Sequence, residues 1–300
     1  MFLSFEKPKP LTDDKKESHE QETSIPDKVV NHETPRHLRM YGDKTIDLFC
    51  SQFSVTGLDD FKKFRTEHPD EKFIISSSHL HNLDVPAALR TLGPEANIQI
   101  TGESVLLEKM KYLGHKLMIN LAGRSNFTPL DYKENKVGKS GVFNPDNFDE
   151  LEEKMAEGKT PWIAAHPFAL DGKMKRASIG PVYLAAKTGA SVLPTALEVS
   201  GGSVNLEGIK ESAKNLIHRS EATYHIGQPI KFPPLDVSII GKVLAAREKG
   251  DEVSPEDLAD FKAVHQELKS RADILAQAIS NLLPEEKRGY YSQLEQPGEE

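Results

Sequence analysis

Short apolar runs recur along the chain and are separated by longer stretches that mix apolar with polar residues. Phe73–Ile75 is such a run, with two β-branched members, and it ends in three consecutive serines. Runs of this length and composition predict buried strands. The same pattern predicts strands at Lys116–Leu121, Pro161–Ala165, Ser191–Leu197 and Ala222–Ile226.

The stretches between these runs carry helical signals. Pro86 stands where a first helical turn would follow Asp84, and Asp84 can cap that helix. Ser254, with Asp257 three residues later, is typical of the start of another helix. In chain order after Pro86, helices are predicted for about Ser104–Leu113, Asn147–Glu157 before Gly158, Val182–Thr188, Ser238–Lys249 and about Pro255–Leu283.

Alternation of buried strands with helices predicts an α/β fold. We expect a largely parallel central sheet flanked by helices on both faces, with further helices at the C-terminal end. We find no internal repeat and no linker within the periodic region, so residues 37–300 are expected to form a single domain. Residues 1–36 combine Pro, Lys, Asp, Glu, Ser and Thr with few large apolar side chains, which predicts a disordered tail.

Composition narrows the function classes. The formal net charge of −8 argues against a nucleic-acid partner, because phosphate backbones require a clustered basic face. The single cysteine, Cys50, can form neither an internal disulfide nor a thiolate zinc site with other cysteines, which favours a reducing compartment. No apolar run approaches the length that spans a bilayer. We therefore expect a cytoplasmic protein that visits a membrane surface transiently if its substrate is a lipid.

The chemistry-bearing segment follows the run at Phe73–Ile75. His79 stands at the predicted strand end and Asp84 at the predicted helix start, so both side chains can meet over the carboxyl edge of the sheet. A carboxylate bonded to one imidazole nitrogen fixes the tautomer and raises the basicity of the other nitrogen. This pair can take a proton from an alcohol, and it needs no cofactor.

Four residues separate His79 from Asp84, and this segment ends in Leu-Asp-Val-Pro86. Several further landmarks accompany it along the chain. With these landmarks the chain resembles the phospholipid/glycerol acyltransferase family, which includes the lysophosphatidic acid acyltransferases. The resemblance extends from about Val55 to Tyr290. Its other landmarks are Val55-Thr-Gly57-Leu-Asp, Asp171-Gly172-Lys173 followed by Gly180, Val192-Leu-Pro194-Thr-Ala-Leu, and Leu282-Leu-Pro284-Glu-Glu-Lys-Arg288-Gly289-Tyr.

The resemblance implies transfer of a fatty acyl group from acyl-CoA or acyl carrier protein to a hydroxyl of a glycerol-phosphate or lysophospholipid acceptor. His79 would be the general base and Asp84 the residue that orients it. The implied partners are the acyl donor and a lipid acceptor, within lipid metabolism and phospholipid biosynthesis. The chain contains no convincing serine or cysteine nucleophile motif, which agrees with direct transfer without an acyl-enzyme.

The chain departs from the family's second and third motifs. Where the third motif normally reads Pro-Glu-Gly-Thr-Arg, this chain has Ala-Ala-His166-Pro-Phe, without the glutamate or the arginine in register. Arg124 directly follows Gly123 and is a shifted counterpart of the phosphate-contacting arginine of the second motif. Lys173, Lys175 and Arg176 can supply positive charge for a phosphate instead. We take Arg124, Lys173, Arg176 and His166 as candidate substrate-binding residues.

Two other functions stay open at this stage. A metal-dependent hydrolase could begin its site with His79-x-His81 and add His166, His225 and a distal aspartate as later ligands. A non-catalytic lipid-binding relative would explain the missing glutamate of the third motif. Structural roles are the simpler interpretation for several candidates: a buried hydrogen-bonded ring for His81 and His166, core filling for Trp162, and a solvated loop for the basic cluster.

Overall fold

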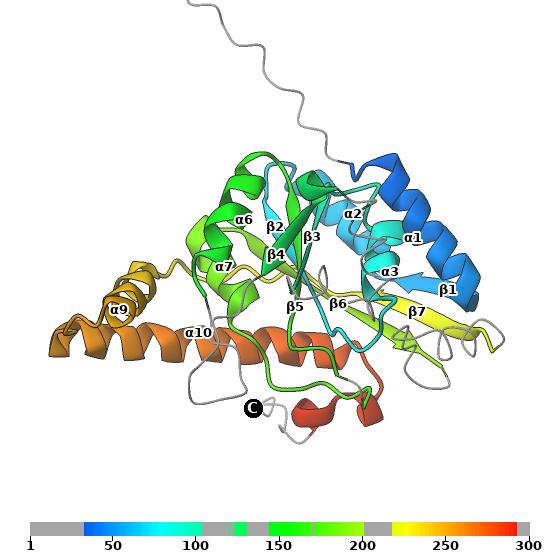
Figure 1. Ribbon diagram of the computed structural model, residues 1–300. Helices are drawn as coiled ribbons and strands as arrows, with labels where there is room; N and C mark the ends of the chain where they lie inside the picture. The colour runs from blue at the N-terminus through cyan, green and yellow to red at the C-terminus, as the bar shows by residue number, and fades with distance from the viewer. Residues whose placement is uncertain are drawn as a thin grey trace, which may run out of the picture. The chain divides into compact units, whose positions relative to one another are not determined.

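One seven-stranded sheet forms the centre of the protein (Figure 1). The computed structural model describes residues 33–103, 120, 123–130, 144–169, 171–200 and 218–292. The strand order is β1-β7-β6-β2-β5-β3-β4, so β2 lies in the middle of the sheet. The strands are β1 Cys50–Thr56, β2 Phe73–Ser77, β3 Ile98–Glu103, β4 Phe127–Leu130, β5 Thr160–Ala164, β6 Ser191–Val199 and β7 Ser220–Ile226.

Five neighbouring strands, from β6 across β2 and β5 to β3 and β4, are parallel. β7 pairs antiparallel with β6, and β1 pairs parallel with β7, so these two strands run opposite to the rest. The predicted α/β fold with a largely parallel sheet is therefore confirmed. In the centre, Ser77 at the end of β2 aligns with Thr195 of β6 and with Ala164 of β5.

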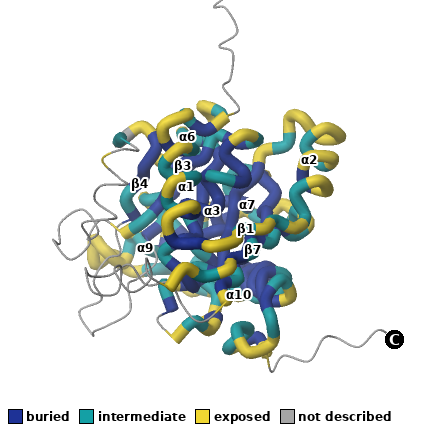
Figure 2. Tube along the Cα trace, turned by 90° about the vertical axis from the view of Figure 1, so that its right-hand side faces the viewer, coloured by how far each residue is buried: buried dark blue, intermediate teal, exposed yellow. Residues whose placement is uncertain are grey.

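Helices cover both faces of the sheet, because both faces of the central strands are apolar. Ile74 and Ile75 are adjacent in β2 and therefore point to opposite faces. Ile75 packs in one apolar cluster with α1 (Arg36–Phe49), α2 (Leu58–Glu67) and α3 (Asp84–Thr91). Ile74 packs in a second cluster with α6 (Asn147–Ala156), α7 (Gly180–Thr188), α9 (Ser238–Lys249) and α10 (Pro255–Asn281). Figure 2 shows the buried residues concentrated in the sheet and on the inner sides of these helices.

Most of the predicted elements are confirmed within a few residues. The predicted strands at 73–75, 161–165, 191–197 and 222–226 are β2, β5, β6 and β7, and the four later helices are α6, α7, α9 and α10. The hydroxyl of Ser254 accepts the backbone N–H of Asp257 at 3.0 Å, as the capping pattern predicts. The helix predicted at about 104–113 lies outside the described residues. Of the strand predicted at 116–121, only Asn120 is described, and it is helical, so the strand prediction is wrong at that position.

Four elements in the N-terminal third of the domain have no counterpart among the elements predicted from the sequence: α1, β1, α2 and β3. β1 ends at Thr56 and α2 begins at Leu58, so the Val-Thr-Gly landmark is a strand-to-helix turn. Gly57 has a φ of 76° in that turn. An L-residue there would be strained in the left-handed region, which explains the glycine.

Of the tail predicted for residues 1–36, residues 1–32 lie outside the described residues. Within the part of it that is described, Thr34 is buried and its hydroxyl donates to the carbonyl of Ala96 at 2.6 Å. The same hydroxyl accepts the N–H of Ile98 at 3.0 Å. Among the described residues, none of the helices has both the length and the apolar character needed to cross a bilayer.

Candidate active site

His79 lies just beyond the carboxyl end of the central strand β2. β2 ends at Ser77 and α3 begins at Asp84, so a six-residue connection carries the histidine over the edge of the sheet. Its φ is 47°, the one positive φ found at a non-glycine position among the described residues. Such a conformation costs about 1–3 kcal/mol unless local contacts favour it, and residues held in this way cluster at functional sites.

The structure brings His79 and Asp84 together. Nδ1 of His79 and Oδ2 of Asp84 are 3.7 Å apart, which is an ion-pair contact but is longer than a hydrogen bond. The Asp84 side chain is completely buried, whereas 27% of the His79 side chain is exposed. The pair therefore has a fixed, enclosed carboxylate and an imidazole that solutes can reach.

Asp84 is fixed by the loop that precedes it. Oδ2 accepts the backbone N–H of His81 at 2.7 Å. The possibility that Asp84 serves as a helix cap is wrong: Asp84 is the first helical residue, Leu83 holds the N-cap position, and no side chain caps the helix there. The carboxylate instead bonds backward to the turn, because its side chain is directed toward the loop that carries His79.

Two aromatic side chains hold the His79 ring. The ring centroid of Trp162 in β5 lies 5.5 Å from that of His79, and the centroid of Phe168 lies 5.1 Å away, both in edge-to-face geometry. Trp162 is 2% exposed, so it fills the core, as predicted, and also forms a wall of the site. Nothing in the sequence marks Phe168, an aromatic residue in a loop, as a neighbour of a histidine that follows another strand.

Two further histidines near the pair are buried and held neutral. Burial lowers the pKa of His81 to about 4 despite the opposing effect of Asp84. Burial also lowers the pKa of His166 to about 4; the carbonyl of Pro167 opposes this shift, and positive charge on His79 adds to it. Nδ1 of His166 lies 2.7 Å from that carbonyl oxygen. Positive charge on His79 lowers the pKa of both histidines, and His81 in addition donates its backbone N–H to Asp84.

Buried hydroxyl groups accompany Asp84 on the same face of the sheet. Thr195 and Leu197 are two positions apart in β6 and therefore point to the same face of the sheet. Tyr224 of β7 is paired with Leu197, and Ser77 of β2 is aligned with Thr195. All four therefore face α3, which carries Asp84. Burial raises the pKa of Tyr224 and the negative charge of Asp84 raises it further. The sequence pattern could have indicated these polar positions, because they interrupt apolar strands.

Positive charge approaches the histidines from the C-terminal segment. Lys287 belongs to the short 3-10 helix η3 (Glu285–Lys287), and its ammonium donates to the carbonyl of Val199 at 2.7 Å. Burial lowers the pKa of Lys287, against the opposing effect of Glu198 and Glu286. Its charge contributes to the low pKa of His81. In the sequence, Lys287 is recognisable only as part of the closing landmark, and no role is predicted for it.

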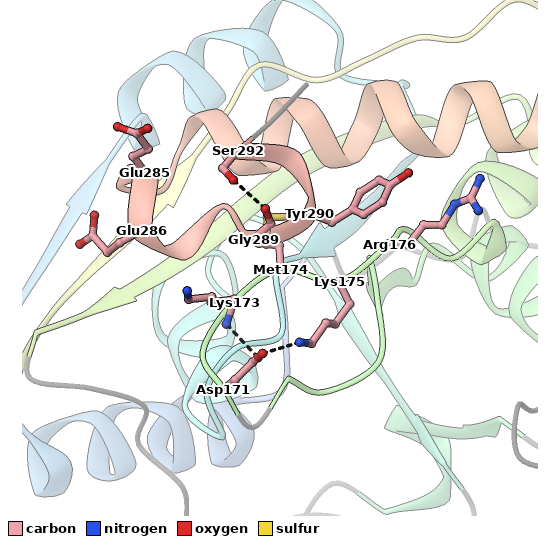
Figure 3. A pocket seen from close by; sticks show the side chains of 10 residues that line it. All are labelled: Asp171, Lys173, Met174, Lys175, Arg176, Glu285, Glu286, Gly289, Tyr290 and Ser292. Atoms are coloured by element: carbon pink, nitrogen blue, oxygen red, sulfur yellow. Dashed lines mark hydrogen bonds and ion pairs between the residues drawn. The ribbon is translucent and has the colours of Figure 1, made fainter. Parts of the chain in front are cut away.

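The candidate residues Lys173 and Arg176 line a pocket of about 760 Å³ (Figure 3). Its other wall is formed by residues 285–292, including the 3-10 helix η4 (Gly289–Ser292), while His79, Asp84 and His166 are not among its lining residues. Lys175 is paired with Asp171. Lys173 and Arg176 form no ion pair among the described residues, and Figure 3 shows their charged ends pointing in different directions.

Arg124 lies away from this assembly. It begins the 3-10 helix η2 (Arg124–Asn126), which leads into the amino end of β4. Because β4 is parallel to the central strands, that end is at the sheet edge opposite to His79. The neighbouring Asn126 accepts a hydrogen bond from Lys159, which precedes β5, at 2.6 Å. The structure thus gathers His79, Asp84 and His166, and does not bring the Arg124 backbone to them.

The ligand set required for the hydrolase alternative is not assembled in the described part of the chain. No group of three His, Cys, Asp or Glu residues there is arranged to hold a metal ion. His225 points to a different neighbourhood, with Nδ1 at 2.9 Å from the hydroxyl of Thr56 and Nε2 at 3.2 Å from Glu198.

Comparison with known proteins gives one type of match. No family model matches the chain, and no curated protein matches it. Among solved structures, the chain is similar to the crystal structure of the 1-acyl-sn-glycerophosphate (LPA) acyltransferase PlsC from Thermotoga maritima. The match has 18% sequence identity and a TM-score of 0.44, and it covers 79% of this chain and 78% of that chain.

Proposed function

We propose that the protein is an O-acyltransferase that uses His79 as its general base and Asp84 as the residue that orients the base. The observation that carries this proposal is the contact of a partly exposed imidazole with a fully buried carboxylate at 3.7 Å. The contact lies over the carboxyl end of a central parallel strand, where open α/β sheets bind their ligands. Catalytic hydrogen bonds in unliganded proteins are often longer than in the reactive complex.

In the proposed reaction, the acceptor hydroxyl gives its proton to His79 while its oxygen attacks the carbonyl carbon of an acyl thioester. A C–O bond forms, and the tetrahedral intermediate then breaks its C–S bond. The protonated ring returns the proton to the departing thiolate, so the products are an ester and a free thiol. Asp84 stabilises the imidazolium that forms between these two steps.

The proposed donors are acyl-CoA and acyl carrier protein, and the proposed acceptors are a glycerol phosphate or a lysophospholipid. The order of landmarks around His79 and Asp84 supports these substrate classes. The pocket is lined by three cations, Lys173, Lys175 and Arg176, and by three carboxylates, Asp171, Glu285 and Glu286. Lys173 and Arg176 form no ion pair among the described residues, so these two cations are the proposed contacts for an anionic group of one substrate. We propose that this pocket binds a phosphate group, and that replacing Lys173 raises KM more than it lowers kcat.

The test is a panel assay with the full chain. Purified protein is incubated with acyl-CoA and acyl carrier protein donors of several chain lengths, together with glycerol 3-phosphate and lysophospholipids, and products are read by mass spectrometry. We expect an ester product and release of free thiol. Binding of acceptors without any product would favour the lipid-binding alternative. Hydrolysis that requires stoichiometric zinc would favour the hydrolase alternative.

A further inference from the structure

His166 carries a ring nitrogen that has no hydrogen-bond partner among the described residues. The residue is 1% exposed, and Nε2 is buried. The other nitrogen, Nδ1, lies 2.7 Å from the carbonyl oxygen of Pro167. A carbonyl oxygen can only accept, so Nδ1 carries the proton and Nε2 presents a lone pair. His166 is therefore a buried hydrogen-bond acceptor that the described residues leave without a donor.

This tautomer is stable at neutral pH. Burial lowers the pKa of His166 to about 4, so the ring is uncharged above that pH. Buried serine hydroxyls of β2 also have no partner, but a hydroxyl hydrogen can rotate toward any nearby acceptor. The His166 ring has no such freedom, since turning it would break the bond to Pro167. Only a donor that arrives from outside the described residues can satisfy Nε2.

His166 belongs to the same site as His79. It lies two residues before Phe168, whose ring packs on the His79 ring with a centroid separation of 5.1 Å. The backbone N–H of Ala165, which directly precedes His166, donates to the carbonyl of Ser77 at 2.9 Å, so the carboxyl ends of β5 and β2 lead side by side into His166 and His79. A molecule that offers its hydroxyl to His79 therefore brings its adjoining atoms close to His166.

We infer that Nε2 of His166 accepts a hydrogen bond from a second hydroxyl of the acyl acceptor, which is on the carbon adjacent to the one that bears the hydroxyl deprotonated by His79. This inference rests on the proposed function and makes it more specific. It assigns the acceptor to the class of vicinal diols, such as glycerol 3-phosphate, in preference to lysophospholipids with a single free hydroxyl. A thioester carbonyl and an ionised phosphate offer no hydrogen, so neither can fill this role.

The experiment compares two acceptors that differ only in the second hydroxyl. Glycerol 3-phosphate has it, and 3-hydroxypropyl phosphate lacks it. We expect kcat/KM of the full-length protein to be at least about tenfold higher for glycerol 3-phosphate, because a site built for a hydroxyl leaves its own polar group unpaired when the analogue binds. His166→Leu removes the acceptor, and we expect the two substrates to become equivalent within about twofold of each other.

His166→Gln tests the same point with an acceptor retained. A glutamine oxygen can reach the position of Nε2, so part of the preference should return, which a merely structural role would not produce. Thermal melts of both variants check folding; Pro167 is exposed, so its carbonyl can bond to water after the substitution. The inference is overturned if the unmodified protein turns over both acceptors equally, or if His166→Leu slows both by the same factor. Absence of turnover with every acceptor would instead contradict the proposed function.

Discussion

The Oδ2 atom of Asp84 lies 3.7 Å from Nδ1 of His79. The same oxygen accepts the N–H of His81 at 2.7 Å, so the carboxylate is anchored to the turn that carries the imidazole. The ring is held from its sides by Trp162 and Phe168. A small rotation of the ring would convert the contact into a hydrogen bond, and the opposite ring nitrogen would then be the basic one.

Replacing the base should remove most of the activity. We expect His79→Ala to lower the rate of acyl transfer by at least about 10²-fold, the lower end of general-base contributions, without a loss of the fold. The measurement is turnover under saturating substrates, with circular dichroism to check the fold. His68→Ala is the matched control, because His68 is exposed at the end of α2 and should leave turnover unchanged. Full activity of His79→Ala would disprove the assignment of the base.

The orienting residue can be tested with two substitutions that separate charge from structure. Asp84→Asn keeps an oxygen that can accept the His81 N–H, so stability should change little, while loss of the charge lowers turnover by about 10²-fold or more. Asp84→Ala should lower turnover as well and should cost a further 1–3 kcal/mol, roughly, because the buried N–H loses its partner. Denaturant unfolding and turnover are measured on both. Wild-type turnover in Asp84→Asn would contradict an orienting carboxylate.

The α/β fold could be predicted because the strands at the centre of the sheet are apolar on both sides. β2, β5 and β6 are nearly continuous buried runs of five to nine residues that contain β-branched members, whereas the stretches between the runs mix apolar with polar positions. The reversed direction of β1 and β7 could not be predicted, since strand direction depends on pairing between distant segments. β1 is half exposed and rich in Ser, Thr and Gln, so its own residues do not mark it as a strand of the central sheet.

Only those parts of the site that lie close together in the sequence could be predicted. His79 and Asp84 are five positions apart, so the strand-to-helix connection places them together whatever the rest of the fold does. Phe168, Tyr224 and Lys287 reach the same region from three other segments, and no local pattern links them to His79. The opposite position of Arg124 has the same cause, because the order of strands in space decides which edge a loop occupies.

The neutral buried histidines predict a specific pH dependence of stability. The pKa of His166 is about 4 in the folded protein and about 6.5 in the unfolded chain, so the unfolded state binds more protons between these values. The contribution of neutral His166 to the free energy of unfolding is therefore fully present above pH 6.5 and is lost as the pH falls from 6.5 to 4. The loss for His166 is about 3 kcal/mol, and His81 adds a similar loss.

Unfolding by urea at several pH values between 7 and 4 measures this dependence. We expect His166→Gln to flatten the curve, because glutamine takes up no proton in either state. His68→Gln, an exposed position, is the control and should leave the slope as it is. An unchanged slope in His166→Gln would show that other groups cause the acid sensitivity.

The boundary of the packed domain predicts a contrast between two deletions. Removing residues 1–30 should leave the melting temperature nearly unchanged, because their composition offers little apolar surface to bury. Removing residues 1–35 also removes Thr34, whose hydroxyl bonds both Ala96 and Ile98.

Thr34→Val in the full chain should lower the free energy of unfolding by about 2 kcal/mol, at about 1 kcal/mol per lost hydrogen bond. Thr66→Val on the exposed side of α2 is the control for this substitution. For the deletion of residues 1–30, a large fall in melting temperature would disprove the prediction that these residues form a tail that does not pack on the domain.

The turn at Gly57 allows the cost of backbone strain to be separated from the cost of steric contact. Gly57 has a φ of 76°, and a Cβ atom there would lie 2.0 Å from the carbonyl oxygen of Ile226. Gly250 has a φ of 78°, yet a Cβ atom there would meet nothing within 4 Å. Gly250→Ala should therefore cost only the left-handed backbone penalty of about 1–2 kcal/mol. Gly57→Ala should cost about 1–3 kcal/mol more, because β1 or β7 must move to admit the methyl group. Equal losses of unfolding free energy in the two variants would mean that the turn yields without disturbing the sheet.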